Sequence, residues 1–391
     1  MLPIHAKTVY VDPDIENAMN CQRRLRRVLP NVNCDDVQDL KPDTIENVMR
    51  IGKRRHGKDD LGDDAVLVFT TFDEDRTDWF YHWRSPEGRH GGMCQGALEL
   101  NIVDGCVFRC AYCGFGRYII FYLNVERLID GLDSIFEKYP NQRLYKYSNM
   151  TDLPPFEPEL DAIPPMIERF ADEADRYVML FTKSHNVDFL TDLNHNGQTI
   201  ISWSLSSHTV SREIDKRAAT MEERIEAMAR MQAAGYHVRA RLSPIVPIAN
   251  WREDYAELFE VLFDRVDPDV VTLELLGWMD FDDLTRMFGK SLFDPEALRK
   301  AKEAREELAG VGWGPFTQET HDEVYSFCID TVQKISPGTA VAVCHGTPTT
   351  WKLLADKMQM SPDAYVCNCG PLSTPGGDIY DRWDKTTLSR T

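Results

Sequence analysis

Apolar runs of strand length alternate with amphipathic segments of helical spacing along most of the chain. This alternation predicts an α/β fold. Successive strand–helix repeats imply parallel strands joined by right-handed crossovers. In such barrels, whole or partial, chemistry collects at the carboxyl ends of the strands. We expect a partial (βα)6 barrel of the TIM type, with strands at 97–103, 143–148, 177–182, 199–205, 236–243 and 270–276.

Helical patterns lie between these strands, at 125–139 and most clearly at 220–234. Thr220 and Glu223 have the spacing of a capping box, which satisfies the free N–H groups at a helix start. Gly235 follows the last residue of the pattern and is a typical helix stop.

Two extensions flank the predicted barrel, which we bound at residues 96–285. The leading extension, 1–95, has a small α/β pattern, and the turn-rich sequence 85–92 marks its end. The trailing extension, 286–391, is mainly helical, and its polar last residues are expected to be ordered only by docking. The individual patterns are strands at 7–11, 65–69 and 340–343, helices at 14–28, 294–308 and 320–334, and a charged loop at 53–64.

The charge balance changes the expected class of partner. The 391 residues include 44 basic and 63 acidic side chains, for a net charge of -19, whereas a nucleic-acid surface rewards clustered Lys and Arg. No apolar run reaches the length of about 18 residues that a membrane helix needs, and the N-terminus lacks a signal segment. We expect a cytoplasmic protein with no membrane partner. Its ten cysteines then fit metal or redox chemistry better than disulfides.

Three of these cysteines follow the first predicted barrel strand at the spacing C-x3-C-x2-C, as Cys106, Cys110 and Cys113. Thiolates this close in sequence can bind one metal centre. Iron–sulfur clusters usually have four cysteine ligands, so three leave one iron open to a small molecule. The alternatives are a structural zinc loop and three unrelated core cysteines. Zinc prefers four ligands in paired short motifs, and no second C-x2-C follows.

This spacing, with Tyr112 directly before the last cysteine, resembles the signature of the radical S-adenosylmethionine (SAM) superfamily. The resemblance implies a 4Fe-4S cluster whose open iron is chelated by SAM. It also implies a reductive cleavage that yields a 5'-deoxyadenosyl radical, which takes hydrogen from a substrate. A reductant such as flavodoxin or ferredoxin would supply the electron.

Further blocks, in order and with similar spacing, resemble the spore photoproduct lyase family over roughly residues 7 to 265. They are 7–14, 181–187, 201–205, 220–227 with 235–236, and 243–245. The resemblance implies that Cys106, Cys110 and Cys113 bind the cluster.

The same resemblance implies a set of SAM contacts. Lys183 and Ser204 match positions that hold the methionyl carboxylate, and Thr151 and Asp152 match a polar pair at the amino group. Ser243 lies where the adenosine packs, and Tyr112 belongs to the cofactor loop. Without the resemblance, Lys183 would be expected to be a solvated charge after a strand, and Asp152 an ordinary turn residue.

Two departures from the family pattern bear on the substrate. Asn149 occupies the position of the cysteine that returns a hydrogen atom to the product radical, and an amide N–H cannot replace a thiol in that role. Gly114 stands where a supporting tyrosine is expected. We therefore expect a small-molecule or peptide substrate rather than spore photoproduct DNA. The alternatives are a photoproduct repair lyase with a substitute hydrogen donor and a non-catalytic metal-cluster protein.

The trailing extension adds Cys328, Cys344, Cys367 and Cys369. They indicate either a second metal site or a replacement thiol donor that enters the active site from the tail. The alternative is buried free cysteines, which Cys328 inside a helical pattern fits best. His345, beside Cys344, is similarly open to a structural or a functional interpretation. Candidates to shape a polar substrate pocket from strand ends are Tyr147, Asn149, His185, Arg241 and Glu274.

Overall fold

The structure is a computed structural model that describes residues 1–52, 65–73, 77–80, 95, 97–116 and 118–381. The predicted charged loop at 53–64 and the predicted boundary loop at 85–92 lie outside the described residues. No helix within the described ranges is both long and apolar enough to cross a membrane.

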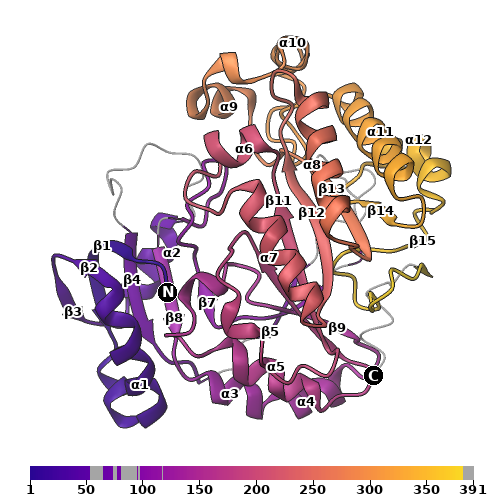
Figure 1. Cartoon of the computed structure of the whole chain (residues 1–391). Helices are drawn as coiled ribbons and strands as arrows, with labels where there is room; N and C mark the ends of the chain where they lie inside the picture. Colours follow the sequence, from indigo (N-terminus) through magenta and orange to yellow (C-terminus); the bar gives the residue numbers. More distant parts are fainter. Residues whose placement is uncertain (53–64, 74–76, 81–94, 96, 117, 382–391) are drawn as a thin grey trace.

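The larger sheet is the predicted partial barrel. Seven parallel strands run in the order β14-β13-β12-β11-β10-β9-β6, and β5 joins antiparallel at the β6 edge (Figure 1). All six predicted strands are present, and the predicted strand at 340–343 extends the same sheet as a seventh parallel member. The bounds are β5 Thr77–Phe80, β6 Ala97–Leu100, β9 Leu144–Tyr147, β10 Tyr177–Thr182, β11 Thr199–Leu205, β12 His237–Ile245, β13 Val270–Leu275 and β14 Ala340–Val343.

Helices cover the outer face of this sheet, as parallel strands require. Every residue of β11 is buried, which shows that both of its faces are covered. Helix α5 (Ile163–Ala171) lies against β10, and α7 (Met221–Ala233) lies against β11 and β12. The predicted capping box of Thr220 and Glu223 is confirmed at the start of α7. The remaining helices of this layer are α3 Val125–Asp130, α4 Leu132–Lys138, α6 His208–Glu213 and α8 Trp251–Arg265.

The second sheet consists of strands from the leading part of the chain and of two later strands, β7 and β8. Its order is β2-β1-β4-β8-β7, and β3 also pairs with β1. Strands β7 and β8 come from beyond residue 96, so the chain passes from barrel strand β6 into this sheet and back. The bounds are β1 Ile4–Val11, β2 Val32–Cys34, β3 Val37–Asp39, β4 Ala65–Thr70, β7 Val103–Asp104, β8 Tyr118–Tyr122, α1 Met19–Val28 and α2 Thr44–Gly52.

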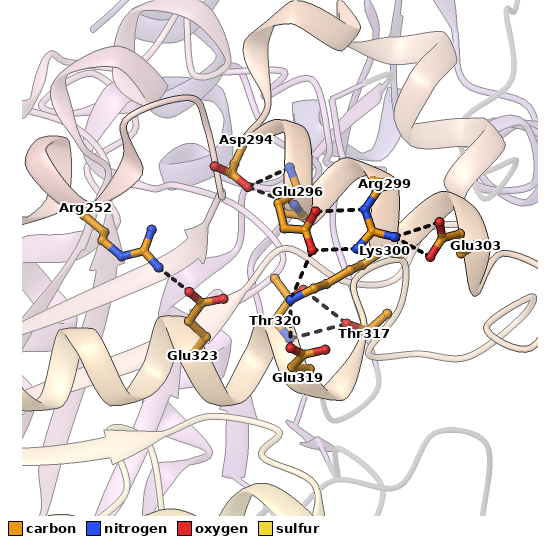
Figure 2. Close-up of polar contacts among 11 residues, drawn as sticks. Arg252, Asp294, Glu296, Arg299, Lys300, Glu303, Thr317, Glu319, Thr320 and Glu323 are labelled. Atoms are coloured by element: carbon orange, nitrogen blue, oxygen red, sulfur yellow. Dashed lines mark hydrogen bonds and ion pairs between the residues drawn. The ribbon is translucent and has the colours of Figure 1, made fainter.

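The trailing helices attach to the barrel through α11, which lies against β13, β14 and α8. Figure 2 shows the charged contacts on its exposed side. Arg252 of α8 pairs with Glu323 of α11, and Lys300 of α10 pairs with Glu319 of α11 at 2.9 Å. The bounds are α9 Phe281–Met287, α10 Pro295–Glu303, α11 Gln318–Ile335 and α12 Pro348–Met358.

After α12 the chain returns to the amino ends of the barrel strands. Residues 364–374, which we call the tail segment, begin with β15 (Ala364–Tyr365), paired with β16 (Tyr380–Asp381). The Pro371 carbonyl accepts hydrogen bonds from the backbone N–H groups of Arg143 (2.8 Å) and Leu144 (3.1 Å) at the amino end of β9. The tail segment is therefore part of the barrel core and does not extend freely into solvent.

Candidate functional site

The three cysteines of the C-x3-C-x2-C motif lie on the loop between β7 and β8. The Cys106 N–H donates to the Phe115 carbonyl (2.8 Å), and the Cys113 N–H donates to the Cys110 carbonyl (2.8 Å). Gly105 enters the loop with a φ of 97°, and a Cβ there would lie 1.8 Å from a backbone carbonyl oxygen of β8. Only glycine fits that position. The sequence thus fixes a closed loop that presents three thiols together.

Cys110 is buried, and Cys106 and Cys113 are partly exposed. Burial raises the pKa of Cys106 and Cys113 above the usual thiol range and raises the pKa of Cys110 to about 12. The thiolate is the metal-binding form of cysteine. A metal centre on this loop must therefore displace protons as it binds.

The loop after β9 packs directly against the cysteine loop. The Gly105 N–H donates to the Met150 carbonyl at 3.1 Å, which joins the two loops at their bases. Asn149, Thr151 and Asp152 lie on this second loop, so the structure brings these three predicted residues beside the cysteines.

Asp152 is fixed by the end of β10. Its Oδ1 accepts from the Thr182 hydroxyl (2.7 Å), and its Oδ2 accepts from the Lys183 backbone N–H (2.6 Å). Burial raises the pKa of Asp152 to about 6 although both bonds favour the carboxylate. The neighbouring Thr151 hydroxyl is buried and has no hydrogen-bond partner among the described residues. Such groups are rare in folded proteins, and this one can bond a ligand.

Lys183 is not a solvated charge. Its Nζ lies 2.6 Å from Oδ2 of Asp215 and donates a second hydrogen bond to the Tyr112 hydroxyl on the cysteine loop. The same Asp215 oxygen accepts from Arg224 (3.1 Å) and from the Ser206 hydroxyl (2.7 Å). Although burial alone would raise the pKa of Asp215, the charges of Lys183 and Arg224 hold it well below its usual value.

The two predicted serines lie on neighbouring strands. Ser204 is buried near the end of β11, and its carbonyl accepts from Arg224 at 2.9 Å. Ser243 lies on β12, and its hydroxyl donates to Oε2 of Glu274 on β13. Ser204 therefore lies in one cluster with Lys183, Asp215 and Arg224, which we call the Lys183 group. The Ser243 hydroxyl is instead hydrogen-bonded to Glu274.

The structure does not bring Tyr147 or His185 to this group. The Tyr147 hydroxyl donates to the Ala162 carbonyl (3.0 Å), and its alternation with Lys146 puts it on the helix-covered face of β9. The His185 side chain is 53% exposed and lies 3.9 Å from Glu223 on the surface. For both residues, these contacts indicate a structural role and not a role in the candidate site.

A second group of charges lies inside the barrel. Lys146 of β9 pairs with Glu99 of β6 at 3.1 Å, and the two side chains are only 4% and 1% exposed. Burial raises the pKa of Glu99. Burial alone would lower the pKa of Lys146, but the nearby Cys369 sulfur and the Glu99 carboxylate outweigh it and raise the pKa. Phe181 is close to both this ammonium and Arg241, with its ring centre 5.2 Å from Lys146 Nζ and 5.4 Å from the Arg241 guanidinium carbon.

The tail segment completes this interior. Arg239 of β12 donates to the carbonyls of Asn368 (2.7 Å) and Thr374 (2.8 Å) and to the Ser373 hydroxyl (2.9 Å). Cys369 packs against the inward side chains at the amino ends of the strands, which are Leu144, Met179 and Ile200.

Cys367 and Cys369 form a hydrogen-bonded pair of thiols. The hydrogen bond from Cys367 lowers the pKa of Cys369 to about 5, with help from the charges of Lys146, Arg241 and His345 and against the effect of burial. Cys367 is the donor of this hydrogen bond and Cys369 is the acceptor.

A third group lies at the ends of β13 and β14. Glu274 Oε1 lies 2.7 Å from His345 Nδ1, and Cys344 Sγ lies 3.7 Å from the same nitrogen. Arg241 binds the other oxygen of Glu274 at 2.5 Å. The sequence predicted these residues separately, and the structure brings them together.

Asp215, Arg224, Glu99 and Lys146 were missed by the sequence analysis. Glu99 and Lys146 carried a usable signal, because a charge inside a short apolar strand has to be paired when it is buried. Asp215 and Arg224 carried none, since they lie on a turn and in a helix where charges are usually solvated.

Comparison with known proteins agrees with this geometry. The family model described as spore photoproduct lyase matches residues 95–291, which is half of the chain. The spore photoproduct lyase of Bacillus subtilis (strain 168) is 30% identical over 187 residues, which cover 45% of this chain and 55% of that protein. The spore photoproduct lyase of Clostridium acetobutylicum is 24% identical over 244 residues, covering 60% and 72%. The chain thus matches little more than half the length of the first of these relatives.

Solved structures share the fold over a longer stretch. Spore photoproduct lyase complexed with dinucleoside spore photoproduct superposes with a TM-score of 0.63 at 16% identity, over 87% of this chain and 98% of that one. A mutant with bound AdoMet and the same dinucleoside gives a TM-score of 0.64 at 16% identity, with the same coverage. These likenesses support the partial barrel with its leading α/β sheet. Together with the match over half of the sequence, they show that the chain belongs to the spore photoproduct lyase family of the radical SAM superfamily.

Proposed function

We propose that the chain is a radical SAM enzyme that repairs a photoproduct-type lesion and takes its returning hydrogen atom from a thiol of the tail segment. The family match supports the enzyme class, and it supplies no reason to exclude spore photoproduct. Our expectation of a different substrate rested on Asn149, Gly114 and the net charge of -19, and it gains no support from the comparisons. The alternative, a lyase with a substitute donor, is better supported.

The residues present fit the two cofactors. Cys106, Cys110 and Cys113 lie on one closed loop and can ligate three irons of a 4Fe-4S cluster. The unpartnered Thr151 hydroxyl faces no competing protein group among the described residues. When bound, the cluster and SAM supply a one-electron cleavage that yields a 5'-deoxyadenosyl radical for hydrogen abstraction. A one-electron donor of the flavodoxin or ferredoxin class is the implied partner.

The Lys183 group is suited to an anionic ligand. Lys183 and Arg224 carry the two positive charges of this group, and Asp215 and the nearby Asp152 carboxylate offset them. Tyr112 ties this group to the cysteine loop through Lys183. A carboxylate that binds here gains a charge-assisted hydrogen bond at low cost, because Asp215 has already oriented the ammonium.

The observation that carries the substrate proposal is the thiol pair of the tail segment. Asn149 offers no transferable hydrogen atom, but the Cys367 thiol donates a hydrogen bond to Cys369 inside the barrel. Lys146 of β9, whose charge helps to lower the pKa of Cys369, lies three residues before Asn149, which is on the loop after that strand. The pair therefore lies deeper in the barrel than the position it would replace.

The hydrogen return can be written in balanced form. The Cys367 S–H bond breaks, a C–H bond forms on the product radical, and a sulfur radical remains on Cys367. One electron from the named reductant class and one proton from water restore the thiol.

The cofactor part is tested by anaerobic iron and sulfide analysis. Cys110→Ala should lose the cluster and SAM cleavage completely, because a three-ligand site has no spare thiolate. Cys34→Ala, which removes a half-buried thiol from β2, should retain both. A stoichiometric cluster in Cys110→Ala would contradict the assignment. A cluster without 5'-deoxyadenosine formation in the unmodified chain would favour the non-catalytic alternative.

The substrate part is tested with a photoproduct-bearing oligonucleotide, SAM and reductant. We expect thymine to be recovered by the unmodified chain and by Cys34→Ala, and to be lost in Cys367→Ala. Asn149→Cys, introduced together with Cys367→Ala, should restore it by returning a thiol to the usual position.

A chain that cleaves SAM but yields no thymine would instead support the second candidate, a small-molecule or peptide substrate. The net charge of -19 favours that candidate, because a DNA ligand needs a local basic path.

A further inference from the structure

Glu274, Cys344 and His345 form a compact set of three different ligand atoms. The carboxylate oxygen, the thiol sulfur and the imidazole nitrogen all lie within 4.8 Å of one another. None of these residues belongs to the cysteine loop or to the Lys183 group. The Glu274 and His345 side chains are each 12% exposed, so the set is sheltered but open to a small solute.

The backbone holds these side chains in place. The Cys344 N–H donates to the Leu273 carbonyl at 2.8 Å, which continues the pairing of β14 with β13 by one residue. His345 then turns back with a φ of 56°, in the left-handed region that bulky residues rarely adopt. This turn brings the imidazole over the end of β13. Strain of this kind is concentrated at ligand-binding positions.

Glu274 is oriented by a second layer of contacts. Its Oε2 accepts from Arg241 at 2.5 Å and from the Ser243 hydroxyl, and its Oε1 faces His345. One oxygen of the carboxylate is thus bound by supporting residues, and the other faces the proposed ligand set. Metal-binding carboxylates in proteins are typically held by outer partners in this way. Arg241 lies on the supporting side, where it neutralises the oxygen that does not face the set.

A pocket opens on the remaining side of the set. It is lined by Trp278, Trp313, Tyr325 and the three ligand residues. Trp278 also has a left-handed backbone, with a φ of 62°, and its ring meets the His345 ring edge to face at 5.7 Å between centres. Two residues with left-handed backbones therefore frame one pocket, and its volume of about 20 Å³ has room for about one water molecule.

We propose that Glu274, Cys344 and His345 bind a zinc-type divalent cation, whose fourth position faces the pocket lined by Trp278 and Trp313. A thiolate, an imidazole and a carboxylate are the three ligand types that zinc accepts, and a set of three leaves one position for water or a substrate oxygen. Harder ions such as Mg²⁺ prefer an all-oxygen set, and this site does not offer one.

The test uses the full chain with Cys106→Ala, Cys110→Ala and Cys113→Ala introduced together, so that no metal can bind at the cysteine loop. After chelator treatment, the protein is dialysed against zinc, and metal per chain is measured by mass spectrometry. We expect one zinc per chain. Cobalt should give a thiolate charge-transfer band and the absorption of a four-coordinate ion.

Point variants in the same background assign the ligands. Cys344→Ser and His345→Gln should each weaken zinc binding by at least about a hundredfold, and Ser243→Ala, which removes only an outer contact, by about tenfold. Cys34→Ser, a thiol of similar exposure on β2, should bind as the background does. Thermal melting of each variant checks that it is folded.

Two results would overturn the proposal: no zinc in the triple variant, or binding that Cys344→Ser and His345→Gln leave unchanged. Neither result bears on the proposed radical SAM activity, because the cysteine loop takes no part in this measurement.

Discussion

Charged side chains are used in two different ways inside this barrel and on the helices attached to it. On the surface, Arg252 and Glu323 join α8 to α11 with side chains that are 47% and 46% exposed (Figure 2). In the interior, Arg224 and Asp215 form an ion pair in which both side chains are fully buried. The chemistry of the two pairs is the same, but water screens only the first.

This difference shows where function is concentrated. Exposed ion pairs contribute little to stability, so the surface contacts can vary without consequence. Buried charges are expensive to remove from water and persist only where they are paired and hydrogen-bonded. In this chain two groups of buried charges lie where the proposed chemistry needs them, at Lys183 beside the cysteine loop and at Lys146 beside the tail segment. Others, such as Arg24 and Glu157, lie away from both places and have a structural role.

The largest effect is expected from breaking the Lys146–Glu99 pair. Lys146→Met removes one partner and leaves a buried carboxylate, which should lower the free energy of unfolding by about 3 to 5 kcal/mol. Adding Glu99→Gln should recover part of that loss because no unpaired charge remains. Denaturant unfolding measures both variants. A loss as small as that of a surface pair would mean that Lys146 is solvated.

A pH dependence should come from His321, which is buried in α11. Burial lowers its pKa to about 4, only partly offset by its hydrogen bond to the Trp313 carbonyl, so the unfolded chain binds more protons between about pH 6.5 and pH 4. The contribution of His321 to stability therefore rises with pH across this window and falls by roughly 3 kcal/mol as the solution is acidified through it. His321→Gln should flatten this part of the curve. An identical slope in that variant would assign it to other groups.

Lys183→Ala should leave the cluster intact and weaken SAM binding by about ten- to a hundredfold, since one charge-assisted contact of roughly 1.5 to 3 kcal/mol is lost. Calorimetric titration of anaerobic protein measures the affinity. Unchanged binding would show that Lys183 has only a structural role, as the partner of Asp215.

The smallest effect is expected at the surface. Arg252→Ala breaks the pair with Glu323 and should lower the free energy of unfolding by less than about 1 kcal/mol. Its thermal midpoint should also become less sensitive to added salt, because an exposed pair is screened. A loss comparable to that of Lys146→Met would remove the distinction between the two regions.

Much of the fold could be predicted because its signals are local. The strands recur as apolar runs, the capping box of Thr220 lies within four residues, and the C-x3-C-x2-C motif lies within eight. The predicted helix at 125–139 is instead two helices that meet at Gly131, a residue of low helix propensity.

The remaining parts depend on contacts between distant segments. The Lys183–Asp215 pair spans 32 residues, and the Ser202 hydroxyl reaches Asn368 across 166 residues. No local pattern encodes which side chain a buried charge will meet. The tail cysteines could be named from the sequence as candidate donors, but only the three-dimensional fold shows that Cys369 lies near Lys146 inside the barrel.

The claim that a tail thiol returns the hydrogen atom is tested most directly by isotope transfer. The reaction is run in deuterated water with an unlabelled photoproduct oligonucleotide, and the thymine is analysed by mass spectrometry. Because the Cys367 S–H exchanges with solvent, we predict one deuterium per repaired photoproduct, carried by one of its two thymines, in the unmodified chain and loss of that product in Cys367→Ala. Recovered thymine without deuterium, or with undiminished yield in Cys367→Ala, would contradict the account.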